Sequence, residues 1–340
     1  MRLTRLRQPA GLGKLELAYS EPRRPGPGEV LMRVRASSLN FHDYSVVTGK
    51  LPTEDGRIPM SDGAGEIVEV GPPLPCSAAE PQLKAGDAVV SLFYRRWVHG
   101  PASADCLVDV PGDHVDGFAS EYVTLPAFAL TFAPKGYSAA EAATLPCAGL
   151  TAWRALMVDG PLLPGQTVLV QGTGGVSVFA LQFAKIVGAT VIATSSSDEK
   201  LARLKALGAD HLINYRREPQ WARRVVDITG GIGVDHVLEV GGPDTLPQSL
   251  EAVRVGGHVA MIGVLTGAQG PVSTLLLLRK NVRLQGLTVG NRCHQLDMVR
   301  AVDATGMRPI IDSHFPLESI ADAFRHQEAN RHFGKICLDI

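Results

Sequence analysis

Residues 167–187 have the sequence TVLVQGTGGVSVFALQFAKIV. The first part of this stretch, Thr167 to Gly172, is mostly apolar, as expected of a strand that is buried on both faces. Apolar residues at helical spacing follow from Val176 to Val187, and glycines separate the two segments. A buried strand, a glycine turn and a helix in this order predict the beginning of a parallel α/β sheet.

Strand and helix patterns continue to alternate after this stretch, and Gly208 is placed to cap the second helix. The predicted strands are 167–172, 190–194, 211–215, 234–240, 258–262 and, after a looser stretch, 283–289. The predicted helices between them are 176–187, 198–207, 220–228 and 246–253. Six strands at the lengths of βαβ units predict a doubly wound, parallel, six-stranded Rossmann sheet.

The first 130 residues have a different pattern, in which clusters of glycine and proline separate short strand-like runs. The predicted strands here are 30–36, 64–70, 87–93 and 119–124. The long segment 94–117 is either a lobe or loop over a site, or a disordered insertion. In the last 40 residues we predict one helix, 317–328, and one strand, 335–338. We expect these elements to return to the first domain, because six strands already complete the Rossmann sheet.

The composition is that of an ordinary globular protein, with 340 residues, 45% hydrophobic and 20% charged, and the length suggests two domains. The 33 basic and 34 acidic residues give a net charge of −1, which argues against nucleic acid as the main partner. No apolar run approaches a membrane span, and the N-terminus has no secretory signal. Five scattered cysteines indicate reduced thiols, so we expect a cytoplasmic protein. Because no membrane span is found, we expect no membrane partner.

The glycine turn carries a dinucleotide-binding pattern, G-x-G-x-x-S, from Gly172 through Gly174 to Ser177. The first glycine permits a tight turn, the second lets a pyrophosphate approach the backbone, and the third position needs a small residue. The helix that begins at Gly175 and Val176 offers free N–H groups to phosphates. We therefore predict a dinucleotide site; the alternative is a tight turn without a ligand.

The residues after the second predicted strand indicate which dinucleotide binds. NAD-binding proteins place a carboxylate there, but this chain has Ser195 and Ser196, and Asp198 better suits the first turn of the next helix. A carboxylate would repel a 2′-phosphate, whereas small hydroxyls admit it. Lys200 adds positive charge one turn later, unless it is simply a solvated helix residue. These residues favour NADPH over NADH.

The stretches AGLTAW (148–153), 164–185 and 189–216 resemble the medium-chain dehydrogenase/reductase superfamily. Three earlier segments agree with this resemblance: SLNFHD (38–43), SDGAGEIVEVG (61–71) and LKAGDAVV (83–90). Among the branches of the superfamily, the chain is most similar to the zinc-independent quinone oxidoreductase-like group. The resemblance covers nearly the whole chain.

The resemblance implies an α/β protein with a GroES-like, β-rich catalytic domain and a Rossmann NADP-binding domain. We expect the catalytic domain at 1–130, completed by 305–340, and the Rossmann domain at 131–304. The resemblance also implies an active site in the cleft between the domains, a small-molecule substrate and, usually, a homodimer. Pairing through the edge of the sixth strand, near Gly286 to Gly290, is the expected mode.

The same resemblance places further cofactor contacts. Lys200 and Tyr215 match positions that contact the 2′-phosphate and the adenosine in NADPH-dependent quinone reductases. Arg331 lies within one residue of a third such contact. Thr151 corresponds to a threonine that contacts the cofactor across the superfamily.

Zinc-dependent members hold a catalytic zinc with a cysteine, a histidine followed by an acid, and a second cysteine. In this register the chain has Asn40, then Ser61 and Asp62, and only the last ligand remains, as Cys147. One thiolate does not hold a zinc ion. The stretch matching the structural-zinc lobe has only two cysteines, Cys76 and Cys106, instead of four. We predict no zinc; the alternative is an unusual site made from His42, Asp43, His99 or His114.

Without a metal, the enzyme lacks a Lewis acid that polarises a carbonyl. Quinones and α,β-unsaturated carbonyls suit such a site best, because conjugation spreads the charge created by hydride addition and a few hydrogen-bond donors then suffice. The chemistry therefore favours reduction of a quinone or an enone over that of a simple ketone.

Three neighbouring residues are candidates for catalysis. Asn40 would bond a substrate carbonyl or the nicotinamide, or else orders the loop through a backbone bond. His42 would donate the proton that follows hydride transfer, or else faces solvent. Asp43 orients the loop more readily than it does chemistry.

Aromatic residues nearby are weaker candidates. Tyr44 would stack on a substrate or simply pack, and Phe93, Tyr94 and Trp97 would line an apolar pocket or belong to the core. Related reductases often carry a tyrosine at the position of Leu51, so a mechanism that relies on that phenol is in doubt here.

The leading hypothesis is thus an NADPH-dependent, zinc-independent reductase of quinones or activated double bonds. One alternative is a zinc-free alcohol dehydrogenase or carbonyl reductase on the same scaffold. A second alternative is an NADPH-binding protein without catalysis, of the kind that lens zeta-crystallins resemble.

Overall fold

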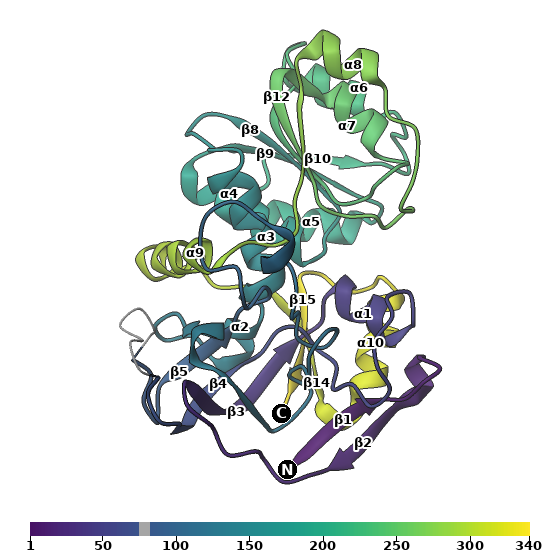
Figure 1. Cartoon of the computed structure of the whole chain (residues 1–340). Coiled ribbons are helices and arrows are strands. Elements are labelled where there is room, and N and C mark those ends of the chain that lie inside the picture. The colour runs from purple at the N-terminus through teal and green to yellow at the C-terminus, as the bar shows by residue number, and fades with distance from the viewer. Residues whose placement is uncertain (75–81) are drawn as a thin grey trace. The chain divides into compact units, whose positions relative to one another are not determined.

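The computed structural model in Figure 1 describes residues 1–74 and 82–340 and divides the chain into two compact units. The N-terminal unit comprises residues 1–150 and 289–340, and the Rossmann unit comprises residues 151–288. The divisions therefore lie after residues 150 and 288, where the sequence predicted 130 and 304. One reason is that Gln295 is buried in the N-terminal unit, where its Nε2 donates to the Ser91 carbonyl oxygen and to Thr131 Oγ1.

The Rossmann unit contains the predicted sheet of six strands, all parallel to their neighbours. Its spatial order is β10 (His211–Asn214), β9 (Thr190–Ser195), β8 (Thr167–Gln171), β11 (Val234–Glu239), β12 (Val253–Met261) and β13 (Arg283–Gly286). Its helices are α4 (Gly175–Val187), α5 (Asp198–Ala206), α6 (Trp221–Ile228), α7 (Leu246–Ala252) and α8 (Thr274–Lys280). Val168, Leu169 and Val170 are completely buried, so the apolar run that predicted the first strand lies in the core.

The N-terminal unit contains a seven-stranded sheet and a separate hairpin of β1 (Arg2–Leu6) with β2 (Leu15–Tyr19). The sheet order is β14 (Ile311–Pro316), β15 (Lys335–Asp339), β3 (Glu29–Ser38), β4 (Ala64–Val70), β5 (Ala88–Ser91) and β7 (Leu130–Phe132), and β6 (Tyr122–Pro126) also pairs with β3. Its helices are α1 (Phe41–Val47), α2 (Ala139–Ala143), α9 (Arg292–Thr305) and α10 (Ile320–Glu328), and α3 (Leu150–Trp153) spans the division.

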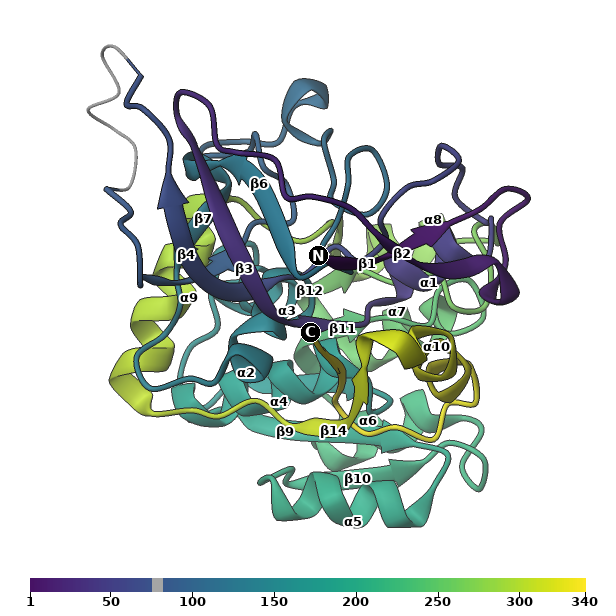
Figure 2. The same ribbon diagram turned by 90° about the horizontal axis from the view of Figure 1, so that it is seen from below.

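The C-terminal segment belongs to this first sheet, as the sequence predicted. β15 pairs antiparallel with β3, with Cys337 opposite Ser38. Figure 2 shows the C-terminal residues, in yellow, beside the N-terminal strands, in purple. This pairing brings residues 335–339 to the end of β3, next to the loop that leads into α1.

Several elements were not predicted. The stretch between β12 and β13 contains α8, a short helix whose Leu275 and Leu278 are exposed, so that it lacks an amphipathic pattern. The helix α9 and the strand β14 were also missed, and β12 begins at Val253, which the sequence placed in a helix. No helix within residues 1–74 and 82–340 has the length and apolar character needed to cross a membrane.

Segment 94–117 is an ordered loop, so the alternative of a disordered insertion was wrong. Trp97 Nε1 donates to the Gly100 carbonyl oxygen at 2.9 Å, and the Gly112 N–H donates to the Val115 carbonyl oxygen at 2.8 Å. Cys106 is buried in this loop. Cys76, the other cysteine of the predicted lobe, lies outside the described residues.

Candidate functional site

The glycine turn between β8 and α4 has open space where the sequence predicts a dinucleotide. Gly172 has a φ of +72°, a left-handed conformation that glycine adopts without strain. A Cβ atom at Gly172 or Gly174 would meet no heavy atom within 4 Å beyond the neighbouring residues. Ser177 is buried, and its hydroxyl donates to the Gln171 carbonyl oxygen at 2.6 Å. The serine thus closes the turn on the protein side while the glycines leave its outer side open.

The N-terminus of α4 is suited to an anion. Gly174 occupies the N-cap position and has no side chain to satisfy the N–H groups of the first turn, which begins with Gly175 and Val176. These groups have no partner within an α-helix, and the helix dipole adds partial positive charge at the same end. The turn can therefore hold a pyrophosphate.

The end of β9 carries no free carboxylate. Ser195 is buried, its Oγ accepts from the Ser197 N–H at 3.3 Å, and its carbonyl oxygen accepts from the Tyr215 N–H at 3.1 Å. Asp198 lies in the first turn of α5, where its carboxylate accepts from Asn214 Nδ2 and forms an ion pair with Arg217. Because Asp198 is engaged in this way, the strand end lacks the acidic group that binds the ribose of NAD.

The structure places the predicted cofactor contacts in two groups. Ser195, Ser196, Lys200 and the exposed Tyr215 lie at or just after the ends of β9 and β10 in the Rossmann unit. Thr151 is buried at the beginning of that unit. Arg331 is exposed in the N-terminal unit, in the loop between α10 and β15.

Glu239 was not predicted as a site residue. Its carboxylate forms hydrogen bonds at the ends of both β8 and β11. Its Oε1 accepts from the Gly241 and Gly242 N–H groups at 2.8 and 3.0 Å, and its Oε2 accepts from Gln171 Nε2 at 2.9 Å. The carboxylate is completely buried, so these bonds compensate for its lost hydration. Glu239 therefore supports the strand that leads into the glycine turn.

A second polar cluster lies in the N-terminal unit, where β3 leads into α1. Asp43 is buried, and its two carboxylate oxygens accept from the Asn40 N–H at 2.9 Å and the Ser61 N–H at 2.8 Å. Burial raises the pKa of this carboxyl group, and these hydrogen bonds oppose the rise. Asp43 thus joins the Asn40 loop to the segment that precedes β4, and its role in the reaction stays a prediction.

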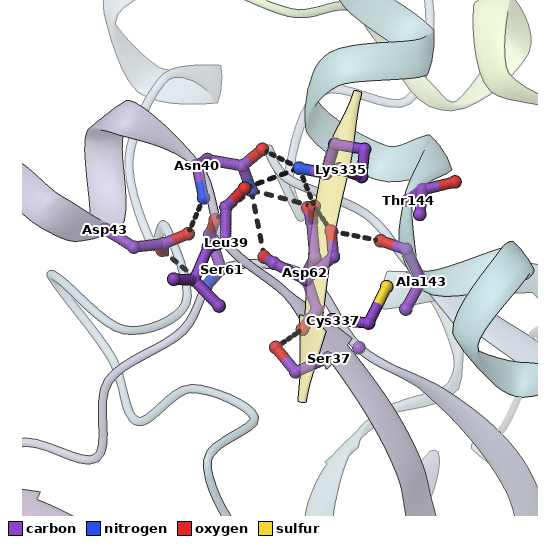
Figure 3. Close-up of polar contacts among 12 residues, drawn as sticks. Ser37, Leu39, Asn40, Asp43, Ser61, Asp62, Ala143, Thr144, Lys335 and Cys337 are labelled. Carbon is purple, nitrogen blue, oxygen red and sulfur yellow. Dashed lines mark hydrogen bonds and ion pairs between the residues drawn. The ribbon is translucent and has the colours of Figure 1, made fainter. Parts of the chain in front are cut away.

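Lys335 is at the centre of this cluster, as Figure 3 shows. Its Nζ donates to the Leu39 carbonyl oxygen at 2.7 Å and to Asn40 Oδ1 at 2.5 Å, and it lies 3.7 Å from Asp62 Oδ2. The side chain of Lys335 is only 3% exposed and that of Asp62 is completely buried. This is a buried ion pair in which the Asn40 amide bonds both partners and the Leu39 carbonyl oxygen bonds the lysine.

Asp62 has one satisfied oxygen and one unsatisfied oxygen. Asn40 Nδ2 donates to its Oδ2 at 2.8 Å, and Ser38 Oγ lies at the same distance from this oxygen. Ser38 Oγ is also 2.9 Å from the Ala143 carbonyl oxygen, so its single proton serves one acceptor at a time. Asp62 Oδ1 is buried and has no hydrogen-bond partner among the described residues. Burial raises the pKa of Asp62 to about 6, and the Lys335 charge opposes this shift.

Lys335 was predicted only as the first residue of the last strand, and not as a site residue. The one local signal is the preceding Gly334, whose φ is +86° and whose Cβ, if present, would lie 2.3 Å from the Ile310 carbonyl oxygen. This close approach sets where β15 begins and hence where the lysine points. A glycine–lysine pair alone does not show that the ammonium is buried.

The residues at the expected metal-ligand positions do not fit a zinc ion. Asn40 Oδ1 is bound by the Lys335 ammonium, and Asp62 Oδ2 is taken by hydrogen bonds. Of the three ligand positions, only Cys147 carries a side chain that binds zinc in related members, and burial raises the pKa of its thiol well above its usual range. Within the described residues, no three His, Cys, Asp or Glu side chains are grouped to hold a metal, including the alternative set around His42.

His42 lies on α1 with its Nε2 3.6 Å from Asp113 Oδ2, and its ring contacts Phe93 edge-on. Burial lowers the pKa of His42, and the Asp113 carboxylate opposes this shift only in part. The imidazole is therefore mainly neutral at neutral pH, and the ordered loop 94–117 supplies its acidic neighbour. A role as proton donor stays a prediction.

The other candidates have contacts within the N-terminal unit. Tyr44 donates its hydroxyl to Glu328 Oε1 at 2.7 Å, on the surface, while Leu51 is 37% exposed. Phe93, Tyr94 and Trp97 are buried, with successive ring centroids 4.9 and 6.2 Å apart. These three residues pack in the interior of the unit, and a pocket-lining role stays a prediction.

Comparison with known proteins agrees with both units. A model of the alcohol dehydrogenase GroES-like domain matches residues 26–135, and a model of zinc-binding dehydrogenases matches residues 175–304. A zinc-type alcohol dehydrogenase-like protein of Schizosaccharomyces pombe is 40% identical over 95% of this chain and 94% of its own length.

Solved structures give the same result. A candidate alcohol dehydrogenase from Sinorhizobium meliloti 1021 is 39% identical with a TM-score of 0.91, covering 100% of this chain and 99% of that one. A mycobacterial protein solved in complex with NADPH is 28% identical with a TM-score of 0.83, covering 100% of both chains.

Proposed function

Because the chain belongs to the medium-chain dehydrogenase/reductase superfamily and is an NAD(P)H-dependent oxidoreductase of the alcohol dehydrogenase-like type, we propose that it reduces quinones or α,β-unsaturated carbonyls with NADPH and without zinc. The observation that carries this proposal is the Lys335 ammonium bound to Asn40 Oδ1, at a position where a zinc-dependent member has a metal ligand.

The chemistry follows from the charges in the cluster. A zinc ion polarises a carbonyl strongly, whereas the Lys335 ammonium is matched by the Asp62 carboxylate 3.7 Å away. When bound, the nicotinamide would supply a hydride from its C4 atom to the acceptor, and a proton from water, or from His42 in its protonated form, would complete the reduction. A conjugated acceptor spreads the negative charge, so it needs less electrostatic help than a simple ketone does.

The preference for NADPH is supported by the end of β9. The Asp198 carboxylate is paired with Arg217, and no other carboxylate follows the strand before α5. Lys200 lies on the same helix turn. A 2′-phosphate would therefore meet hydroxyl groups and positive charge, and the mycobacterial relative with bound NADPH is consistent with this coenzyme.

The test is NADPH oxidation by protein treated with a chelator, with NADH in parallel. Cyclohex-2-enone and cyclohexanone form a matched pair, since they differ only in conjugation, and 1,4-benzoquinone is the third acceptor. We expect turnover with the quinone or the enone, little with the ketone, and a preference for NADPH. Ketone turnover that disappears on chelation and returns with zinc would contradict the proposal.

A zinc-free carbonyl reductase is the second candidate, because several similar proteins are named alcohol dehydrogenases. It predicts that the chelated protein reduces cyclohexanone as fast as cyclohex-2-enone. A protein that only binds NADPH predicts binding without oxidation by any acceptor.

We also propose that two copies pair in a reducing, cytoplasmic environment. β13 is the edge strand of the Rossmann sheet, and the adjacent α8 exposes Leu275 and Leu278 by 54% and 74%. The four described cysteines are all free thiols. Light scattering on wild type and Leu278→Glu tests this: a dimer that becomes a monomer in the variant supports it, and a wild-type monomer refutes it.

A further inference from the structure

The cluster around Lys335 has the composition of a cation site built from oxygen atoms. A backbone carbonyl oxygen of Leu39, the amide oxygen of Asn40 and a carboxylate oxygen of Asp62 converge on Nζ. These three groups come from the loop after β3 and the segment before β4, and Lys335 enters from β15. Oxygen donors of this kind suit a compact, strongly charged ammonium group.

The ammonium also decides how the Asn40 amide is oriented. An ammonium group only donates hydrogen bonds, so the amide must present its oxygen to Lys335. The amide nitrogen then faces Asp62 Oδ2 at 2.8 Å and Ser61 Oγ at 3.3 Å. The Asp62 carboxylate only accepts hydrogen bonds and favours the same orientation, so the ammonium and the carboxylate fix the amide together.

We infer that the Lys335 ammonium is the resident cation of this site: it binds Asn40, which stands at the first metal-ligand position of zinc-dependent members, and it pairs with Asp62, so that it holds both residues in position for the reaction. This inference rests on the proposed function for its catalytic part, because Lys335 acts through Asn40 and Asp62. Lys335 is accordingly a positioning residue.

A matched pair of variants separates charge from size. Lys335→Met keeps nearly the same length and removes the charge, and Lys280→Met removes another ammonium that donates to two backbone carbonyl oxygens, those of Glu251 and Val253, in the Rossmann unit. We expect Lys335→Met to lower kcat about 100-fold through misplacement of its partners, with the Kd for NADPH unchanged. Lys280→Met should leave kcat unchanged.

Chemical rescue tests the cation directly. Lys335→Ala removes three carbons and the ammonium, so propylammonium can replace what is missing, and 1-propanol is the neutral control of the same size. We expect propylammonium, and not 1-propanol, to restore part of the turnover and to raise the melting temperature of Lys335→Ala. Wild type should show neither effect.

A second variant covers the case in which the single variants are too unstable. Lys335→Met combined with Asp62→Asn removes both buried charges and should recover the melting temperature without recovering turnover. If turnover returns together with stability, Lys335 is only structural and the inference is wrong. It is equally wrong if Lys335→Met keeps wild-type kcat, or if propylammonium and 1-propanol act alike on Lys335→Ala.

Failure of the proposed function is distinguishable from failure of this inference. If chelated wild type reduces none of the acceptors, the proposed function fails, while the effect of propylammonium on the melting temperature of Lys335→Ala still tests the cation site. Zinc content gives an independent readout. Retention of one zinc per chain by wild type after chelation and reconstitution would overturn the inference whatever the activity.

Discussion

The glycine turn of the Rossmann unit and the Lys335 cluster of the N-terminal unit are both built around groups that bind charge. The turn is made from consecutive residues, Gly172 to Ser177, and its geometry follows from local backbone rules. The cluster joins Asn40 and Asp62 to a lysine that lies 295 residues after Asn40 in the chain. A site made of neighbouring residues is visible as a motif, whereas a site assembled by strand pairing is not.

The largest expected effect concerns the stability of the cluster. Lys335→Met leaves the Asp62 carboxylate buried and unpaired, and breaking a buried ion pair from one side costs about 3–5 kcal/mol. Thermal or urea unfolding should show this loss, with Lys280→Met as the control. Recovery of most of the loss in the variant with Asp62→Asn added would show that the two charges act as a pair. A loss below about 1 kcal/mol would contradict the buried ion pair.

The two units should respond to pH in opposite directions. In the Rossmann unit, His236 and His258 are buried with their Nδ1 atoms 3.4 Å apart, and burial lowers their pKa values to about 4 and about 3. Neutral histidines therefore contribute stability that is present above the unfolded pKa of about 6.5 and is lost as the pH falls toward these values. The advantage of wild type over His258→Asn should shrink by roughly 2 kcal/mol between about pH 7 and pH 5.

Asp62 has the opposite sign, because its folded pKa of about 6 lies above that of an unfolded aspartate. Its contribution is present below about pH 4 and is lost as the pH rises through about 6. The advantage of wild type over Asp62→Asn should therefore shrink as the pH rises across this range. Unfolding measured at several pH values checks both trends, and slopes of the same sign in the two variants would refute the comparison.

A smaller effect is expected in the glycine turn. Gly174→Ala adds a methyl group that meets no protein atom, so the fold should be unchanged. The methyl group would occupy the space through which a pyrophosphate approaches the backbone, and we expect about tenfold weaker NADPH binding, or about 1.4 kcal/mol. Gly13→Ala, also in open space but in the N-terminal unit, is the control. Unchanged NADPH affinity in Gly174→Ala would place the dinucleotide elsewhere.

The smallest expected effect concerns the choice of coenzyme. Ser196→Asp puts a carboxylate after β9, where it repels a 2′-phosphate and can bond a ribose hydroxyl. The ratio of the Kd values for NADPH and NADH should rise about fivefold, or by about 1 kcal/mol. Fluorescence titration with both coenzymes measures the ratio, and Ser196→Asn serves as the neutral control. An equal change in both variants would show that charge at this position is unimportant.

The predicted sheet of the Rossmann unit was confirmed, and its central strands β8 and β9 carry their own apolar runs. β4 was predicted with its observed bounds, Ala64 to Val70, for a similar reason. The helix α8 was missed because its four leucines are consecutive and therefore show no helical spacing; Leu275 and Leu278 are exposed, whereas Leu276 and Leu277 are half-buried. The strand β14 was missed because its residues are half-buried or exposed. The unit boundaries differed because the side chain of Gln295 bonds to residues of β5 and β7, which no local pattern shows.

By itself, the sequence determined the class of the fold, the glycine turn and the absence of a carboxylate at the end of β9, since all of these depend on residues close together in the chain. The resemblance also predicted, position by position, that Asn40 and Ser61 stand where zinc-dependent members have metal ligands, with Asp62 at the place of the acid that follows the histidine. Only the tertiary structure showed that the Lys335 ammonium lies beside Asn40 and Asp62. Pairing of β15 with β3 carries the Lys335 side chain into the loop after β3, and burial of the resulting ion pair depends on contacts between distant segments.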